Sequence, residues 1–275
     1  MGTGEVDQTP IGLNPFLPVP GWPACTALWF NGVVNKPRKF LTAEWRYLAM
    51  LNYEIDPALL LARVPAGTDL DSWHGKTFIS IVGFLFLNTR VLGVPVPFHR
   101  DFEEVNLRFY VRREVGKELR RGVVFVKEIV PRSMIAAVAR TVYSENYVAM
   151  PMSHRVDIAD ATDASGEVEY GWRTGGRWNR LRLKTSGGSA ALRPGSQEEF
   201  ITEHYWGYAR QRDGRTVEYQ VEHPPWRVWQ TSEAVLECDV GEVYGDRFVE
   251  PLSSKPASAF LAEGSAITVR KGVRL

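Results

Sequence analysis

Hydrophobic and polar residues alternate with a period of two in many segments, and this pattern predicts β-strands. In FEEVNLRFYVRR (102–113), Glu104, Asn106, Arg108 and Tyr110 share one face, while apolar residues share the other. Comparable segments predict strands at 76–87, 102–113, 122–130, 165–172, 177–184, 204–210, 216–222, 227–239 and 257–273. We therefore predict a mainly β protein.

Helices are expected only as short segments between these strands. DPALLLARV (56–64) begins with Asp56 as N-cap and a proline at the first helical position. PRSMIAAVARTVY (131–143) is apolar enough for a core-facing helix, and SQEEFITEH (196–204) opens with a capping box.

Turn and loop residues indicate how the chain is divided. TGG at 174–176 predicts a hairpin, and TSGGSAALRPGSQ (185–197) predicts a surface loop. Residues 1–38 are rich in proline and predict an extended arm, followed by a single domain over 39–275.

Composition narrows the class of protein. Aromatic residues make up 12% of the chain, and its 24 glycines and 17 prolines favour many short strands. The formal net charge is only +1, so no strongly charged surface indicates nucleic acid or anionic lipid as a partner. No apolar run is long enough to span a membrane as a helix. The polar amino-terminal sequence and two cysteines favour a cytoplasmic protein.

The segment RGVVFVKEIVPR (121–132) places Lys127 inside an apolar strand. It follows the 102–113 strand after a charged loop, so the two should pair as an antiparallel hairpin. A turn centred on residues 116–117 would put Asn106 opposite Lys127, with Glu104 and Arg108 diagonal to it. Three interpretations of Lys127 follow: a salt bridge to Glu104 on a solvated face, a cation that positions an anionic ligand with Arg108, or a Schiff-base amine activated by burial.

Several longer stretches carry a resemblance to a known family. These are WRYLAMLNYEIDPALLLARVPAGTDLDSWHGKTFISIVGF (45–84), FEEVNLRFYV, GVVFVKEIVPR, ARTVYSENYVAMPM and HPPW. From about residue 40 onward, the chain resembles the YqjF-like family of uncharacterised proteins, within the acetoacetate decarboxylase-like superfamily. The resemblance implies an antiparallel β-barrel with a few short helices, enclosing a small-molecule cavity.

The decarboxylases of that superfamily can be compared motif by motif. Their aromatic-x-Glu strand resembles Phe102-Glu103-Glu104 and selects Glu104 as the residue that faces the active site. Their Gly-Arg-Glu segment, which leads into the Pro-Lys-Lys bearing the nucleophile, resembles ARTVYSENY, with Arg140 in place of the arginine. Asn146 and Tyr147 occupy the region of the lysines, so the resemblance implies no decarboxylase-type Schiff base at that point.

These observations predict a barrel that binds a small polar or anionic molecule, such as an oxo acid. Acting as an enzyme, it would use Glu104 and Lys127 as catalytic residues. The ligand-binding residues would be Asn106, Arg108, Tyr110, Arg140, Asn146 and Trp226. The alternative is a non-catalytic barrel that binds a ligand or partner, and the sequence does not decide between the two.

No other chemistry is indicated by motifs. The five histidines show no metal-ligand spacing, and no phosphate-binding or dinucleotide-binding loop is present. We therefore expect neither a metal nor a cofactor, and the sequence does not define an oligomeric state.

Overall fold

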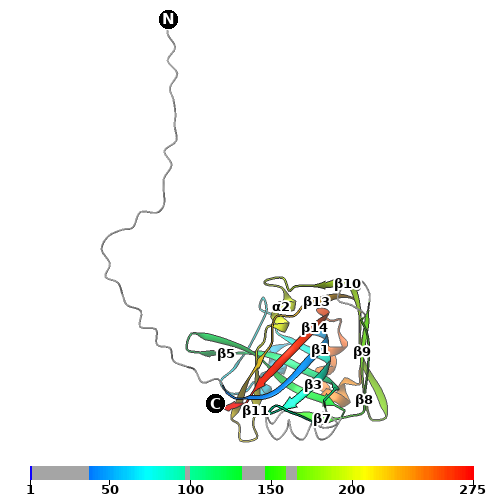
Figure 1. Ribbon diagram of the computed structural model, residues 1–275, viewed down its shortest axis with the longest axis horizontal. Helices are drawn as coiled ribbons and strands as arrows, with labels where there is room; N and C mark the ends of the chain where they lie inside the picture. Colours follow the sequence, from blue (N-terminus) through cyan, green and yellow to red (C-terminus); the bar gives the residue numbers. More distant parts are fainter. Residues whose placement is uncertain (2–36, 97–99, 132–145, 159–165) are drawn as a thin grey trace, which may run out of the picture. The chain divides into compact units, whose positions relative to one another are not determined.

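Strands dominate the computed structural model, which describes residues 1, 37–96, 100–131, 146–158 and 166–275 (Figure 1). The strands are β1 (Lys39–Glu54), β2 (Asp69–Leu70), β3 (Phe78–Val91), β4 (Val94–Pro95), β5 (Phe102–Val115), β6 (Glu118–Val130), β7 (Tyr147–Ala149), β8 (Met152–Asp157), β9 (Glu167–Thr174), β10 (Arg177–Ala190), β11 (Trp206–Arg210), β12 (Thr216–Glu222), β13 (Val228–Glu237), β14 (Ser258–Arg270) and β15 (Val273–Arg274). The helices are η1 (Pro57–Leu59), η2 (Leu61–Arg63), α2 (Gln197–Thr202), α3 (Val240–Tyr244), η3 (Asp246–Phe248) and α4 (Val249–Ser253). The mainly β prediction is confirmed.

Each of the nine predicted strands corresponds to an observed one, and the predicted TGG hairpin joins β9 to β10. Gly175 and Gly176 have φ values of 54° and 83°, which the turn requires and glycine adopts without strain. The long strand β1 was not predicted. Its second half is buried on both faces, so it lacks the alternation that marks a half-buried strand.

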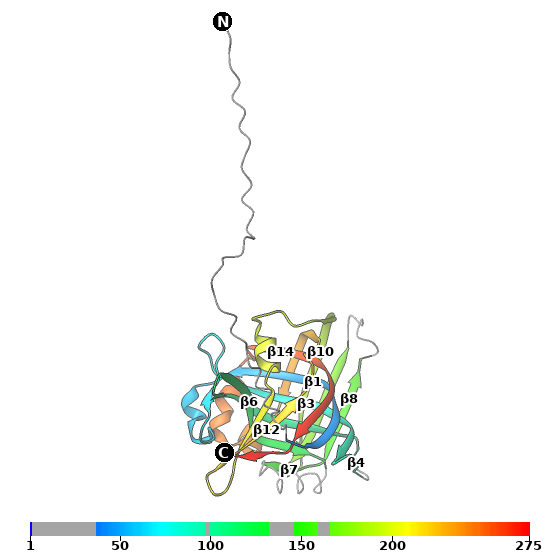
Figure 2. The same cartoon turned by 60° about the vertical axis from the view of Figure 1, so that its left-hand side comes forward.

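The strands form one sheet whose hydrogen-bonded path returns to its start. It runs β12–β11–β6–β5–β3–β1–β14, and β14 pairs again with β12 through Val221–Val269 and Glu222–Thr268. Figure 2 labels β12, β6, β3, β1 and β14 of this path. The path continues from β14 through β13, β10 and β9 to β8. Most of the described strand pairs are antiparallel, as the resemblance implied, but β11–β6 and β6–β7 are parallel, so the sheet is mixed.

The β5–β6 hairpin forms as predicted, but its register changes partway along. Near the turn Phe109 pairs with Val124, which is the register that a turn centred on residues 116–117 gives. Farther along, Asn106 pairs with Glu128, whereas the prediction placed Lys127 there. The predicted contact between Asn106 and Lys127 is therefore wrong.

A β-bulge causes this change. Arg108 pairs with Phe125 and Leu107 with Lys127, so Val126 is an extra residue in β6. An extra residue interrupts the alternation of faces, and two consecutive residues then lie on the same side of the sheet. Val126 and Lys127 consequently share the side opposite Asn106.

The described helices confirm two predicted starts. Asp56 caps η1 by accepting a hydrogen bond from the Ala58 amide (2.9 Å), although two short 3₁₀ turns replace the single helix. Ser196 caps α2 through the Glu199 amide (3.2 Å). The predicted helix at 131–143 lies outside the described residues except for Pro131, as does the arm except for Met1, Pro37 and Arg38. The predicted loop at 185–197 is wrong in its first half, because β10 continues to Ala190.

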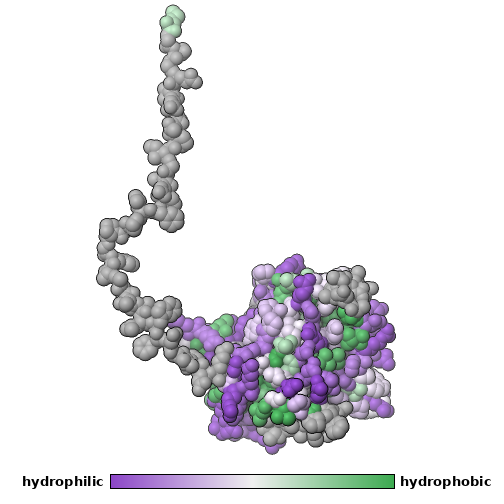
Figure 3. Space-filling model, in the orientation of Figure 1, coloured by the Kyte–Doolittle hydropathy of each residue, from purple (hydrophilic) through white to green (hydrophobic). Residues whose placement is uncertain are grey.

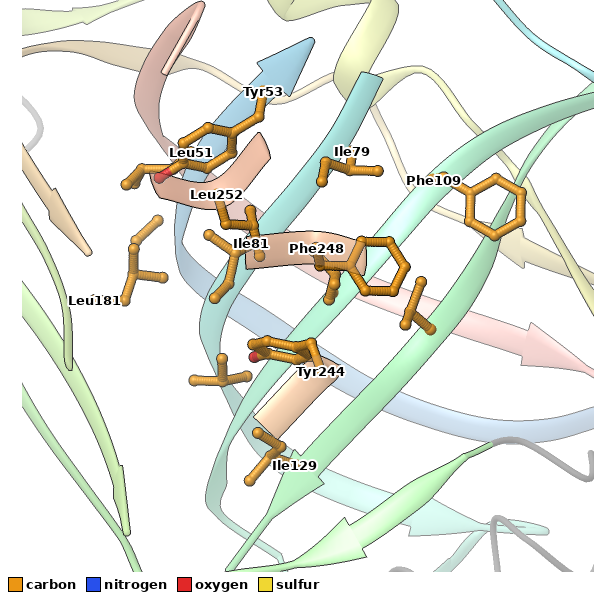
Figure 4. Packing of buried hydrophobic residues seen from close by; sticks show 14 of the residues in the cluster. Leu51, Tyr53, Ile79, Ile81, Phe109, Ile129, Leu181, Tyr244, Phe248 and Leu252 are labelled. Atoms are coloured by element: carbon orange, nitrogen blue, oxygen red, sulfur yellow. The ribbon is translucent and has the colours of Figure 1, made fainter. Parts of the chain in front are cut away.

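Buried apolar residues form two clusters. One lies between the strands and the α3–η3–α4 segment, where Tyr244, Phe248 and Leu252 pack near Ile81 and Phe109 (Figure 4). The other contains apolar residues of β1, β3, β5, β6, β12 and β14 and borders the cavity described below. Hydrophilic and hydrophobic side chains are interspersed on the surface in Figure 3. In the described part of the chain, no helix has the length and apolar character needed to cross a membrane.

Candidate functional site

A cavity of about 170 Å³ lies within the closed path of strands. Each strand of that path contributes to its lining, from Trp45 on β1 to Val269 on β14. Because the lining comes from strands that pair with one another, hydrogen bonds of the sheet fix the positions of these side chains. The strand pairing that forms the fold therefore also positions the residues that line the cavity.

Aromatic rings form much of the cavity wall. Phe86 stacks on Phe102 with ring centroids 4.7 Å apart, and Trp45 meets Trp226 edge to face at 6.3 Å. His223 stacks on Trp226 at 4.2 Å, and burial lowers the pKa of His223 to about 4, so it is neutral near pH 7. This part of the wall suits an apolar ligand surface.

The polar face of β5 supplies the charged part of the lining. Glu104, Asn106 and Arg108 all line the cavity, which agrees with the alternation seen in the sequence. Glu104 is only 2% exposed, and its Oε1 accepts a hydrogen bond from Asn106 Nδ2 (2.9 Å). Burial raises the pKa of Glu104 to about 7, although the hydrogen bonds of Asn106 and Tyr147 and the charge of Arg108 oppose this rise. Both protonation states of Glu104 are therefore populated near neutral pH.

Arg108 is a buried cation without a salt bridge. It is 8% exposed, and among the residues that the structure describes no carboxylate lies within salt-bridge distance. Its Nε is buried without a hydrogen-bond partner in the same part of the chain. The guanidinium contacts the ring of Tyr110, with Cζ 5.7 Å from the centroid. Arg108 thus lines the cavity as a cationic hydrogen-bond donor that forms no salt bridge within the described residues, although its charge acts on the nearby Glu104.

A second carboxylate enters the cavity because of the bulge in β6. Glu128 is 2% exposed and lines the cavity, where the sequence had predicted Lys127. The Tyr147 hydroxyl donates a hydrogen bond to Glu104 Oε2 (3.3 Å) and also interacts with Glu128. Burial raises the pKa of Tyr147, and the two carboxylates raise it further, so its proton stays on the hydroxyl. The sequence analysis did not identify Glu128, because this residue faces the cavity only as a result of the bulge.

His204 is another cavity residue that the sequence analysis did not identify. It follows α2, and its Nε2 lies 3.3 Å from Asp71 Oδ2. Arg121 Nε donates a hydrogen bond to the same oxygen (2.7 Å). Burial lowers the pKa of His204 to about 4 even though Asp71 opposes this effect. His204 is thus neutral near pH 7.

Lys127 lies on the other side of β6. Its Nζ donates a hydrogen bond to the Val243 carbonyl and lies 6.0 Å from the ring centroid of Tyr244. Burial lowers the pKa of Lys127, and the nearby charge of Arg63 lowers it further. The structure therefore does not bring Lys127 together with Glu104, the other residue selected as catalytic.

The remaining predicted site residues lie in different places. Trp226 lines the cavity and donates a hydrogen bond from Nε1 to Ser265 Oγ (2.9 Å). Tyr110 is buried behind the lining, where its hydroxyl lies 2.5 Å from Ser80 Oγ. Asn146 binds the carbonyl of bulge residue Val126 through Nδ2 (2.8 Å) and is not a lining residue.

Arg140 lies outside the described residues. Across the described ranges, no group of three or more histidine, cysteine or acidic side chains is arranged to hold a metal ion. The lining contributed by the described residues also contains no lysine.

Comparison with solved structures defines the class of fold. The chain is similar to the enduracididine biosynthesis enzyme MppR with HEPES buffer bound, with a TM-score of 0.60, 12% identity and coverage of 87% of this chain and 88% of that one. It is also similar to acetoacetate decarboxylase from Legionella pneumophila subsp. pneumophila str. Philadelphia 1, with a TM-score of 0.56, 14% identity and coverage of 94% and 92%. The protein thus has an acetoacetate decarboxylase-like fold.

Sequence comparison then gives the family. Residues 42–266 match DUF2071, described as an uncharacterized conserved protein, and the chain belongs to this family. It is 28% identical over 205 residues to the uncharacterized protein YqjF of Bacillus subtilis (strain 168), covering 71% of this chain and 77% of YqjF. The family resemblance predicted from the sequence is confirmed.

Proposed function

We propose that this protein binds a small organic anion with an apolar body, inside a β-barrel formed by the closed path of strands, and that Glu104 exchanges a proton with it. The observation that carries the proposal is Arg108, a buried cation that lines the cavity without a salt bridge among the described residues. Leaving a buried charge without a partner costs several kcal/mol. An anionic ligand would offset that cost.

The shape of the lining supports an apolar body beside the charge. Along β5, Phe102 precedes Glu104, Asn106 and Arg108 on the same face, so aromatic and polar groups occupy successive positions. Phe84 pairs with Glu104 across the neighbouring strand. A ligand lying along β5 would place its apolar part among the rings and its anionic group at Arg108.

Glu104 supports a role in proton transfer. A carboxyl group with a pKa of about 7 is populated in both protonation states near neutral pH, which suits a general acid or base. Arg108 would stabilise negative charge that develops on a ligand oxygen when a neighbouring atom loses its proton. With no lysine in the described lining, we propose proton exchange without a Schiff base and do not expect decarboxylation of acetoacetate through an amine.

Proteins with similar folds give further support for small anions. MppR is described in complexes with pyruvate and with the condensation product of pyruvate and imidazole 4-carboxaldehyde. Pyruvate is a small carboxylate, the kind of group that an arginine binds. We extend only this ligand class to the present cavity.

Arg108→Met tests anion binding, with calorimetry of 3-phenylpropanoate and its neutral amide as the measurement. We expect the wild-type protein to prefer the carboxylate, and Arg108→Met to weaken its binding at least about tenfold while leaving the amide nearly unchanged. Arg112→Met is the matched control, because Arg112 is exposed on the same strand. Equal effects of the two substitutions would reject the proposed anion site.

Proton exchange is tested separately with 4-phenyl-2-oxobutanoate in D₂O. We expect the protein to accelerate deuterium incorporation at the carbon beside the carbonyl, and Glu104→Gln to abolish this acceleration while ligand binding persists. Nuclear magnetic resonance measures the exchange. Binding without accelerated exchange in the wild-type protein would instead support the non-catalytic alternative.

A further inference from the structure

His204 and Asp71 form a buried pair that the proposed function does not use. The side chains of His204 and Asp71 are 1% and 6% exposed, and Arg121 also binds Asp71. Burial favours a raised pKa for Asp71, but hydrogen bonds from His204 and Arg121 outweigh it and lower the pKa to about 2. Asp71 is therefore a carboxylate that only accepts hydrogen bonds.

This carboxylate fixes the tautomer of His204. Since Asp71 Oδ2 accepts, the proton of the neutral imidazole must be on Nε2, which lies 3.3 Å away. The other nitrogen, Nδ1, then carries a lone pair. It is buried and has no hydrogen-bond partner among the residues that the structure describes. A buried acceptor without a partner is rare and costly, which indicates that something else satisfies it.

His204 and Arg108 are neighbours in the same cavity. Both line it, and both contact the ring of Tyr110, with the His204 ring centroid at 4.6 Å and Arg108 Cζ at 5.7 Å. The charge of Arg108 also acts on His204. Two residues that line the cavity therefore each carry a buried nitrogen without a hydrogen-bond partner among the described residues, an acceptor on His204 and a cationic donor on Arg108. A ligand that satisfies both needs an anionic group and, near it, a hydrogen-bond donor.

We propose that His204 is a ligand-binding residue whose Nδ1 accepts a hydrogen bond from a hydroxyl group next to the anionic group, so that the cavity selects 2-hydroxy carboxylates. Asp71 and Arg121 are positioning residues, because they hold the imidazole with Nδ1 free to accept. This inference rests on the proposed binding of an organic anion at Arg108. It adds the chemical class of the ligand.

Selectivity follows from the cost of an unsatisfied acceptor. A site built to hydrogen bond a hydroxyl group discriminates strongly against an analogue that lacks it. Two acids test this in calorimetry: 3-phenyllactate carries the 2-hydroxyl group, and 3-phenylpropanoate does not. We expect the wild-type protein to bind 3-phenyllactate at least about tenfold more tightly.

Two substitutions of His204 test the roles of its two ring nitrogens separately. In His204→Gln the side-chain amide can replace Nε2 toward Asp71 but places no acceptor at Nδ1. The ratio of the affinities for 3-phenyllactate and 3-phenylpropanoate should therefore fall close to one. The affinity for 3-phenylpropanoate should change by less than about twofold. In His204→Asn the shorter side chain can present an oxygen near Nδ1, and part of the preference should return. His74→Gln is the control, because His74 is exposed.

The outcomes separate this inference from the proposed function. The role of His204 is overturned if the wild-type protein binds both acids with equal affinity, or if His204→Gln weakens the binding of both equally. In either case, binding that depends on Arg108 still supports the anion site. If Arg108→Met changes neither acid, or neither acid binds, both proposals fail. A preference that disappears in His204→Gln and returns in part in His204→Asn supports the hydroxy acid class.

Discussion

The two faces of the β5–β6 hairpin differ in how completely they are filled. On one face, Leu107 and Phe109 are fully buried against a continuous apolar cluster beneath α3, η3 and α4 (Figure 4). On the other face, Glu104 and Arg108 border a cavity. The same two strands therefore carry a packed core on one side and a cavity lining with polar and charged residues on the other.

Lys127 and Arg108 show how a charged side chain is accommodated on each of the two faces. Lys127 reaches the packed face at its edge, is half-buried, and hydrogen bonds a backbone carbonyl. Arg108 is more deeply buried, and its Nε has no partner among the described residues. On the packed face the polar group is satisfied within the protein. On the cavity face the unsatisfied groups reduce stability, a cost that the anionic ligand proposed above would offset.

Phe109→Ala and Phe102→Ala compare the two faces with the same substitution on the same strand. Phe109 is 0% exposed in the packed core, and we expect its loss to lower the free energy of unfolding by about 3–5 kcal/mol. Phe102 is 7% exposed and borders an existing cavity, so its loss should cost only about 1–2 kcal/mol. Urea denaturation measures both, and equal losses would contradict the contrast between the faces. Ligand affinity should change only in Phe102→Ala.

The pH dependence of the unfolding free energy in Glu104→Gln tests how strongly the cavity face affects the pKa of this carboxyl group. The pKa of Glu104 rises from 4.5 in the unfolded chain to about 7 in the folded protein, so the folded state holds this proton more tightly. Its stabilising contribution is present below pH 4.5 and is lost as pH rises through 7. The difference in unfolding free energy, Glu104→Gln minus wild type, should therefore increase by about 3 kcal/mol between pH 4.5 and pH 8.

Urea melts across this pH range test the expectation. Glu114→Gln is the control, because Glu114 is exposed on the same strand and its difference should stay nearly constant. Groups that titrate in both proteins, such as His204 and His223, cancel in the difference. A constant difference for Glu104→Gln as well would show that its carboxyl group is not held in the buried environment described above.

A double-mutant cycle gives the smallest expected effect. Because the sheet separates Glu104 from Lys127, the effects of Glu104→Gln and Lys127→Met on stability should add to within about 0.5 kcal/mol. Glu104→Gln and Tyr147→Phe remove partners in one hydrogen bond and should show a coupling of about 1 kcal/mol. Coupling between Glu104 and Lys127 would restore the register predicted from the sequence.

Local alternation explains why most of the fold could be predicted. The strands with one buried face were found because their polar and apolar residues alternate, and the polar face of β5 gave three cavity residues, Glu104, Asn106 and Arg108. β1 was missed because half of it is buried on both faces. α3 and α4 were missed because each has five residues, too few for helical periodicity to show.

The rest of the site depends on tertiary contacts. His204 acquires its fixed tautomer from Asp71, which lies 133 residues away in the sequence. Glu128 faces the cavity only because Val126 forms a bulge, and the sequence VVFVKEIV contains no glycine or proline to mark one. In a regular ladder the adjacent Lys127 would take its place.

The bulge at Val126 also has a consequence for how chain length varies among homologues. Because Val126 is the unpaired residue, a homologue lacking it would regain a regular ladder and still keep Glu128 opposite Asn106. Loss of a residue on the far side, between Lys127 and Val130, would instead turn the following side chains to the other face. A one-residue gap at Val126 in an alignment would therefore preserve the chemistry of the cavity, while the same gap two positions later would change it.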